Sequence, residues 1–212
     1  MHKTMRNSVV LLALALAAPV LAAQEVEPNV MLQAVTLEVI AAIKQDRGLL
    51  HGGNLKQGPR LIETKVLPLF DFPRMTQIAV ARNWRLATPE QQAALTSEFK
   101  TLLVRTYSTV LSSYRDQVIE FRSMRAAPAD TEVTVRSVVK QSGTAPVAMD
   151  YDMEKTLAGW KIYDIKVAGV SLVTTYRDSF SERIRDGGVD GLIKALEDKN
   201  RQGDSRSSAP KT

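Results

Sequence analysis

The chain has 212 residues, a formal net charge of +5 and no cysteine. Its length is sufficient for one domain with an ordinary hydrophobic core, and the lack of cysteine excludes disulfide bonds and thiol chemistry. So modest a charge argues against a nucleic-acid-binding protein.

The first residues have the pattern of a secretory signal peptide. Lys3 and Arg6 precede an uncharged apolar run from Ser8 to Ala18, and small residues surround a predicted cleavage point after Ala22 or Ala23. The apolar run is too short to span a bilayer, so we expect residues 1–23 to be removed rather than kept as an anchor. Loss of Lys3 and Arg6 lowers the net charge to +3. The mature protein is therefore predicted to be exported and soluble.

The first half of the chain has helical periodicity. Apolar residues recur at helical spacing over 28–45, and a shorter helical stretch is predicted between Pro59 and Pro68. Asp71 is a candidate cap for a helix that runs to Trp84. The longest helix is predicted from Thr88 to Tyr114, because Thr88, Pro89 and Gln91 form a capping-box start before a wide apolar face.

The second half changes to the alternating period of strands. Four strands are predicted at 117–125, 131–141, 145–155 and 159–167, and their short connections favour an antiparallel meander. Two helices at 172–186 and 189–199 follow, with Gly187-Gly188 between them. A disordered tail is predicted over 201–212. We expect a single α+β domain over 24–200, in which helices cover one face of a curved four-stranded sheet.

Residues that could perform catalysis are scarce. His51 stands alone in a glycine-rich loop, no Gly-x-Ser-x-Gly motif is present, and Ser171 is better interpreted as a helix cap. Asp150 to Glu154 begins like a calcium loop but lacks the turn glycine, and its acids fit the outer face of a strand. We therefore expect no enzyme activity, no metal and no cofactor.

Several segments, in order and over nearly the whole mature chain, resemble one family. They are Phe70-Asp71-Phe72-x-Arg74-Met75, Trp84-Arg85-x-Ala87-x-Pro89-Glu90-Gln91, Phe99-x-x-Leu102-Leu103-Val104-Arg105-Thr106-Tyr107, Gly159-Trp160-Lys161-Ile162-Tyr163-Asp164 and Gly169-Val170-Ser171-Leu172 with Tyr176-Arg177 and Phe180. Together they resemble the MlaC family of periplasmic phospholipid-binding proteins, also described as toluene-tolerance auxiliary components. The chain departs from the family pattern at Ala79-Val80-Ala81-Arg82-Asn83, before Trp84, where a glycine is expected soon after an Ala-Leu pair.

The resemblance implies a soluble, monomeric carrier of the periplasm. It would shuttle glycerophospholipid between an outer-membrane lipoprotein–porin complex and an inner-membrane ABC transporter with its substrate-binding ring, and so maintain the lipid asymmetry of the outer membrane. It also implies a nuclear-transport-factor-like cone with a deep apolar cavity for the acyl chains, and no cofactor beyond the lipid cargo. Two alternatives stay open at this stage: an exported small-molecule enzyme and an envelope docking module with the same fold.

The candidate lipid-binding residues lie on the apolar faces of the predicted elements. They are Met75, Ile78, Ala79, Leu102, Leu103, Thr106, Tyr107, Val110, Met149, Tyr151, Ile165, Val167, Val170, Val173 and Tyr176. Periodicity cannot separate the wall of a cavity from a filled core, because both require the same apolar residues. Four arginines are candidates for attracting phosphate or acidic partners, each with the alternative that it is solvated or ion-paired: Arg74, Arg82, Arg85 and Arg177.

Overall fold

The computed structural model describes residues 26–45, 60–112 and 116–207. The predicted signal peptide and the loop around His51 lie outside these residues. Within the described part of the chain, no helix combines the length and apolar character needed to cross a bilayer.

In the described part of the chain, the sheet is an antiparallel meander of five strands rather than the predicted four. In chain order they are β1 (Val118–Phe121), β2 (Glu132–Lys140), β3 (Val147–Thr156), β4 (Gly159–Val167) and β5 (Val170–Ser171), and each pairs with the next. Strand β1 ends before Arg125, the expected end, because the chain turns toward helix α1 (Pro28–Gln45). There the Ala126 amide donates to the Glu27 carboxylate at 2.9 Å.

The fifth strand follows a tight turn and precedes Leu172, where the sequence predicted the start of a helix. Ala168 and Gly169 both have positive φ, 49° and 82°, which is the backbone of a two-residue hairpin turn. Val167 therefore pairs with Val170. The helical part begins later, with a short 3₁₀ turn, η4 (Thr174–Tyr176), whose Thr174 amide donates to the Ser171 hydroxyl at 2.9 Å.

The helices follow the predicted order. Helix α1 has the predicted bounds. A single π-helical turn, η1 (Ile62–Val66), and a 3₁₀ turn, η2 (Leu67–Leu69), occupy the stretch between the two prolines. Helix α4 (Pro89–Ser112) begins with the expected capping box, in which Thr88 and Gln91 exchange hydrogen bonds of 3.0 and 3.3 Å. Helix α5 (Arg177–Ser207) breaks at Gly188, where two helices were predicted to meet, and continues past Gln202, within the predicted tail.

Helix α3 (Phe72–Val80) ends earlier than expected. Asp71 caps it by accepting a hydrogen bond of 2.8 Å from the Arg74 amide. At its other end Ala81 has φ 54° and ψ −130°, and a 3₁₀ turn, η3 (Ala81–Leu86), follows in place of further α-helix. Ala81 thus adopts a conformation that favours glycine, within the segment where the resemblance predicted a glycine.

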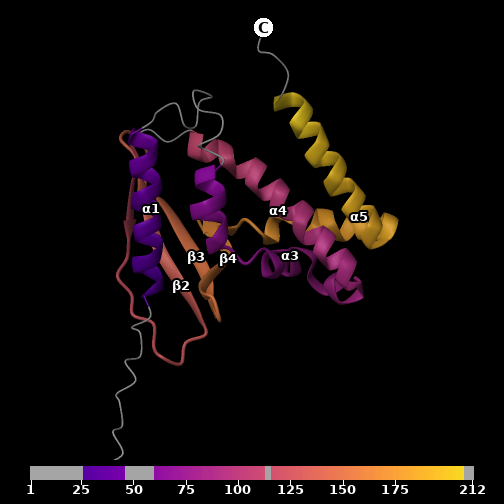
Figure 1. The fold of residues 1–212 in the computed structure, drawn as a ribbon, viewed down its shortest axis with the longest axis horizontal. Helices are drawn as coiled ribbons and strands as arrows, with labels where there is room; N and C mark the ends of the chain where they lie inside the picture. Colours follow the sequence, from indigo (N-terminus) through magenta and orange to yellow (C-terminus); the bar gives the residue numbers. More distant parts are fainter. Residues whose placement is uncertain (1–25, 46–59, 113–115, 208–212) are drawn as a thin grey trace, which may run out of the picture.

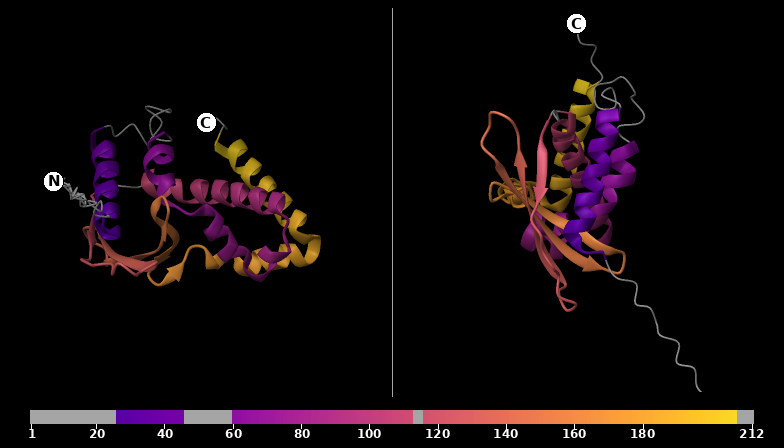
Figure 2. Two further views of the ribbon diagram at one scale, coloured as in Figure 1. Left: turned by 60° about the horizontal axis from the view of Figure 1, so that its bottom comes forward. Right: turned by 90° about the vertical axis from the view of Figure 1, so that its left-hand side faces the viewer.

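The buried residues form two hydrophobic clusters. The sheet core joins α1 to the inner face of the sheet and contains Leu32, Val135, Met153, Trp160 and Ile162. The helical core joins α3, α4 and α5 and includes Leu95, Phe99, Val173, Phe180 and Leu192. Phe70 packs against both cores. In Figure 1 the helices of the helical core extend to one side of the sheet. Figure 2 shows α1 and α4 over the same face of the sheet.

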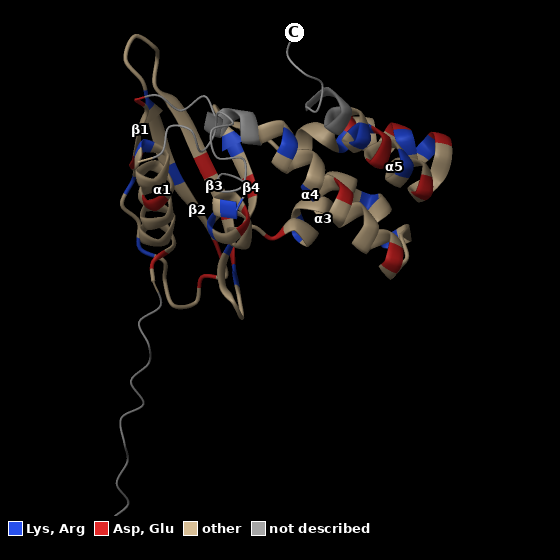
Figure 3. Ribbon diagram, turned by 45° about the horizontal axis from the view of Figure 1, so that its top comes forward, with Lys and Arg blue, Asp and Glu red and all other residues tan. Residues whose placement is uncertain are grey.

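The start of α3 is fixed to the sheet by several contacts. Phe70 forms a parallel bridge with Ile162, whose carbonyl accepts a hydrogen bond of 2.8 Å from the Asp71 amide. The Arg74 guanidinium forms ion pairs with Glu132 (2.6 Å) and Glu154, and its central carbon lies 3.7 Å from the centroid of the Tyr163 ring. These partners raise the pKa of Arg74 against the opposing effect of burial. Elsewhere, charges of both signs are spread over strands and helices, as Figure 3 shows.

Replacing Ala81 with glycine is expected to stabilise the protein. A non-glycine residue with positive φ costs about 1–2 kcal/mol, of which part is offset by the greater freedom of glycine in the unfolded chain. We expect the free energy of unfolding from urea titration to rise by about 1 kcal/mol. The matched control is Ala93→Gly on the exposed face of α4. This variant should lower the free energy of unfolding by about 0.5–1 kcal/mol. Equal losses for the two variants would contradict the strain assigned to Ala81.

Candidate functional site

A cavity of about 550 Å³ lies on the inner face of the sheet, beside the helical core. Three groups of residues surround it: the ends of β3 and β4 with the loop after β5, the segment from η1 to α3, and the middle of α4. Among the described residues, all lining side chains are apolar apart from the hydroxyl of Tyr107. They are Ile62, Val66, Leu67, Phe70, Phe72, Met75, Leu103, Val104, Tyr107, Met149, Ile165, Val167 and Leu172.

The sheet wall follows from strand alternation. Met149 pairs with Val167, and two residues further along β3 Tyr151 pairs with Ile165, so these side chains share one face of the sheet. Met149, Ile165 and Val167 line the cavity, whereas Tyr151 packs in the sheet core and stacks on Phe121 with ring centroids 6.0 Å apart. The sheet core thus ends where the cavity begins.

The opposite wall is the surface of the helical core. Met75 and Leu103 are both buried in that core, and both border the cavity. On α4, Leu103 and Tyr107 are one turn apart, so they lie above one another on one face. Phe70 and Phe72, whose stacked rings have centroids 5.7 Å apart, complete the wall where the two cores meet.

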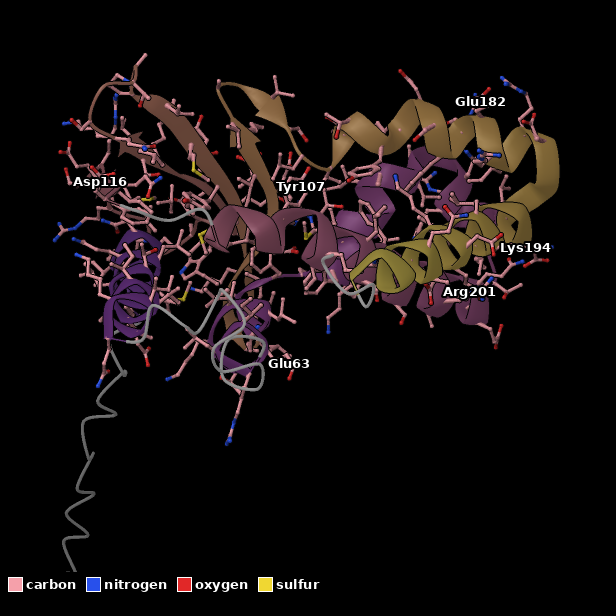
Figure 4. The ribbon with its side chains drawn as sticks, turned by 90° about the horizontal axis from the view of Figure 1, so that it is seen from above. Glu63, Tyr107, Asp116, Glu182, Lys194 and Arg201 are labelled. Carbon is pink, nitrogen blue, oxygen red and sulfur yellow. The ribbon has the colours of Figure 1, made fainter. Side chains whose placement is uncertain are left out.

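Tyr107 carries the polar group of the lining. Burial, together with the neighbouring Tyr176 hydroxyl, raises the pKa of Tyr107 to about 12, so its hydroxyl is neutral at physiological pH. Tyr176 itself packs edge-on against Phe99, with centroids 5.0 Å apart. Figure 4 shows Tyr107 on α4, beside the sheet. The cavity therefore offers an uncharged, almost entirely apolar environment.

The structure brings six of the predicted site residues to the cavity. They are Met75, Leu103, Tyr107, Met149, Ile165 and Val167. The others lie elsewhere. Ala79, Leu102 and Val173 are buried inside the helical core, and Ile78 and Tyr176 pack against it. Thr106 is exposed, and Val170, in the short edge strand β5, is 57% exposed. The side chain of Val110 lies outside the described part of the chain.

Seven lining residues were missed by the sequence analysis. Three of them, Ile62, Val66 and Leu67, come from the short helical stretch. Val66 and Leu67 follow Ile62 by four and five residues, which places all three on one side of η1 and η2. Phe70, Phe72 and Val104 fall within the family motifs and were not selected as site residues. Leu172 follows the unpredicted strand β5, so its position could not be inferred.

The four candidate arginines do not line this cavity. Arg74 is engaged with Glu132, Glu154 and Tyr163, and the Arg177 Nε donates to the Ile78 carbonyl at 3.0 Å. Arg82 and Arg85 are exposed on η3. Among the described residues, no group of histidine and acidic side chains has the arrangement of a metal site.

Comparison with known proteins gives three relatives that cover most of the chain. A phospholipid-binding protein from Ralstonia solanacearum, solved in complex with a phospholipid, is 42% identical, with a TM-score of 0.74 over 84% of this chain and 99% of its own. The intermembrane phospholipid transport system binding protein MlaC of Haemophilus influenzae is 22% identical over 82% of each chain. The toluene tolerance protein ttg2D of Pseudomonas putida is 25% identical, over 85% of this chain and 83% of its own.

The family model of the MlaC protein matches residues 33–198, which include every residue that lines the cavity. This span covers more than half of the chain. The predicted family resemblance is thereby confirmed: the chain belongs to the MlaC family.

Proposed function

We propose that this protein is a periplasmic carrier of glycerophospholipid and that the cavity encloses the acyl chains of its cargo. The observation that carries the proposal is the apolar lining of a cavity bounded by the inner face of the sheet and by α4. Two relatives support it: the Ralstonia protein was solved with a phospholipid, and the Haemophilus protein is named as a component of intermembrane phospholipid transport.

The energetics of lipid transfer explain why a carrier needs such a cavity. A lipid with two acyl chains of roughly 30 methylenes in total costs on the order of 24 kcal/mol to expose to water, at about 0.8 kcal/mol per methylene. A protein that crosses an aqueous compartment with this cargo must cover the chains. The wall of Leu103, Ile165 and Val167 can do so without directional bonds.

Release requires that the same cavity hold the cargo without strong specific contacts. Within the described lining, Tyr107 carries the single polar group, so the contacts with acyl chains would be dispersion and hydrophobic contacts. Such contacts can be exchanged gradually for equivalent contacts in a membrane or in a partner's apolar channel. We infer from this that transfer is passive at the carrier and that its direction is set by the partner proteins.

The finer points of the proposal follow from the family. We propose a nuclear-transport-factor-like cone with a deep cavity, formed by residues 24–200 after removal of a signal peptide at 1–23. The monomeric carrier would act as the soluble component of an ABC-type lipid transport system, between an outer-membrane lipoprotein–porin complex and the inner-membrane transporter with its substrate-binding ring. It would thereby maintain outer-membrane lipid asymmetry, with no catalytic residue and no cofactor.

Native mass spectrometry of the mature protein, purified from a Gram-negative host without detergent, tests the proposal. We expect a mass increment of a phospholipid at a stoichiometry near one, because an apolar cavity in an exported protein would take up lipid from the host membrane. An empty protein that also fails to exchange lipid between vesicles would contradict the proposed function.

Filling the cavity should reduce lipid loading without unfolding the protein. Val167→Trp places a large side chain in the cavity, whereas Val118→Trp makes the same change on strand β1, where the side chain is 55% exposed. We expect the first variant to lose most of its bound phospholipid, measured as phosphorus per protein after purification, and the second to match wild type. Thermal unfolding midpoints near the wild-type value exclude misfolding. Full loading of Val167→Trp would show that the acyl chains lie elsewhere.

Loading is expected to be independent of pH between about 6 and 9. Among the described residues, the cavity lining has one titratable side chain, Tyr107, whose pKa of about 12 keeps it protonated over this range. An unfolded tyrosine loses its proton near pH 10 while folded Tyr107 retains it, so this residue should lower stability as pH rises from about 10 to 12. Phosphorus per protein, measured between about pH 6 and 9, tests the expected loading. The thermal unfolding midpoint, measured between about pH 10 and 12, tests the expected loss of stability. A change in loading near neutral pH would mean that an ionisable group contacts the acyl chains.

A further inference from the structure

A second groove, of about 640 Å³, adjoins the acyl cavity between α4 and the η1–η2 segment. Ile62, Leu67, Phe72 and Val104 line both hollows, so the two are separated only by these side chains. The second groove differs from the first cavity in its lining, because charged residues contribute to its walls. An apolar compartment beside a charged one matches the division of an amphiphile into tail and headgroup.

The charged residues of the groove stand on opposite walls. Lys100 and Arg105 come from α4, and Glu63 comes from η1. On α4, Thr101 lies one turn before Arg105 and Lys100 one turn before Val104, so all four share a side of the helix. The Lys100 ammonium lies 5.3 Å from the centroid of the Phe72 ring, which borders both hollows. A positive charge therefore lies next to the boundary between the groove and the acyl cavity.

The charges at the two ends of this arrangement can interact with a ligand. Within the described part of the chain, neither Glu63 nor Lys100 takes part in an ion pair. Glu63 and Lys100 are exposed, and Arg105 is half-buried. The groove thus has a cationic wall toward α4 and an anionic wall toward η1.

A glycerophospholipid carries its phosphate on the same glycerol unit as its acyl chains. If the chains fill the apolar cavity, the phosphate must lie within a few bonds of the cavity boundary. We propose that the second groove binds the headgroup: Lys100 and Arg105 contact the phosphate, and Glu63 contacts the ammonium of a zwitterionic headgroup such as phosphoethanolamine. This inference rests on the proposed carrier function and adds a preference for a headgroup that carries both charges.

The expected preference is modest because the groups are accessible to solvent. Exposed ion pairs contribute about 0.2–1 kcal/mol each, which corresponds to a change in affinity between roughly 1.5- and 5-fold. Loss of the Glu63 charge should weaken the binding only of phospholipids whose headgroup carries a cation. Loss of the Lys100 charge should weaken the binding of every phospholipid to the same degree, since all of them carry the phosphate.

The test uses the delipidated mature protein and vesicles that contain equal amounts of phosphatidylethanolamine and phosphatidylglycerol with identical acyl chains. After incubation, mass spectrometry measures total phospholipid per protein and the ratio of the two lipids. Glu63→Gln should lower the ratio of phosphatidylethanolamine to phosphatidylglycerol roughly 1.5- to 5-fold relative to wild type. Lys100→Gln should lower the affinity for both lipids and leave the ratio unchanged.

Matched controls are available on α5, away from the groove. Glu182→Gln and Lys194→Gln make the same chemical changes at exposed positions, which Figure 4 shows on that helix. Both should behave as wild type in loading and in lipid ratio. A comparable ratio change in Glu182→Gln would assign the effect to the overall charge of the protein and would overturn the proposal.

The remaining outcomes separate the headgroup site from the carrier function. If wild type takes up no lipid, the proposed function itself fails. If it loads normally but Glu63→Gln keeps the wild-type ratio, the carrier function stands and the headgroup site is wrong. Inorganic phosphate, added to the mixture of protein and vesicles, should compete weakly with phospholipid for the protein. If it binds through Lys100 while Lys100→Gln leaves lipid affinity unchanged, the groove is a site for free anions and the headgroup proposal is wrong.

Discussion

The structure depends on how the apolar inner face of one antiparallel sheet is covered. Strand alternation places Val135, Met153 and Ile162 on this face together with Met149, Ile165 and Val167. Helix α1 covers the first set and forms the sheet core with it. The second set faces α4, whose own apolar residues are already packed against α3 and α5. Two separately packed cores therefore meet along a boundary that neither of them fills, and the cavity occupies this boundary.

One group of contacts between the two cores lies at residues 70–74. Phe70 packs against both cores, the Asp71 amide bonds to the Ile162 carbonyl, and Arg74 ties the start of α3 to Glu132 and Glu154. Of these three residues Phe70 lines the cavity, whereas Asp71 and Arg74, which make the polar contacts, are not among its lining residues. Cavities in protein cores normally reduce stability, because packed contacts are lost. A protein that maintains one here gains room for an apolar cargo, and this is the physical link between the fold and the proposed carriage of lipid.

Sequence reasoning predicted the features that depend on local patterns. The capping box of α4, the Asp71 cap and the break at Gly188 were found where the side chains required them. Strand β5 was not among the predicted elements, because the positive φ of Ala168 is invisible in a sequence pattern and the apolar residues after Gly169 also fit the start of a helix. The cavity was the harder problem. Leu103 and Leu102 are neighbours with the same exposure of 5%, yet only Leu103 borders the cavity, a difference that comes from the placement of α4 against the sheet.

The central claim is that acyl chains occupy the boundary between the two cores. A crystal structure of the mature protein, purified with its native cargo, tests this claim most directly. We predict continuous acyl-chain density in contact with Leu103, Ile165 and Val167, and a phosphate beside α4. Density for lipid at another surface, with side chains closing the space between the sheet and α4, would contradict it.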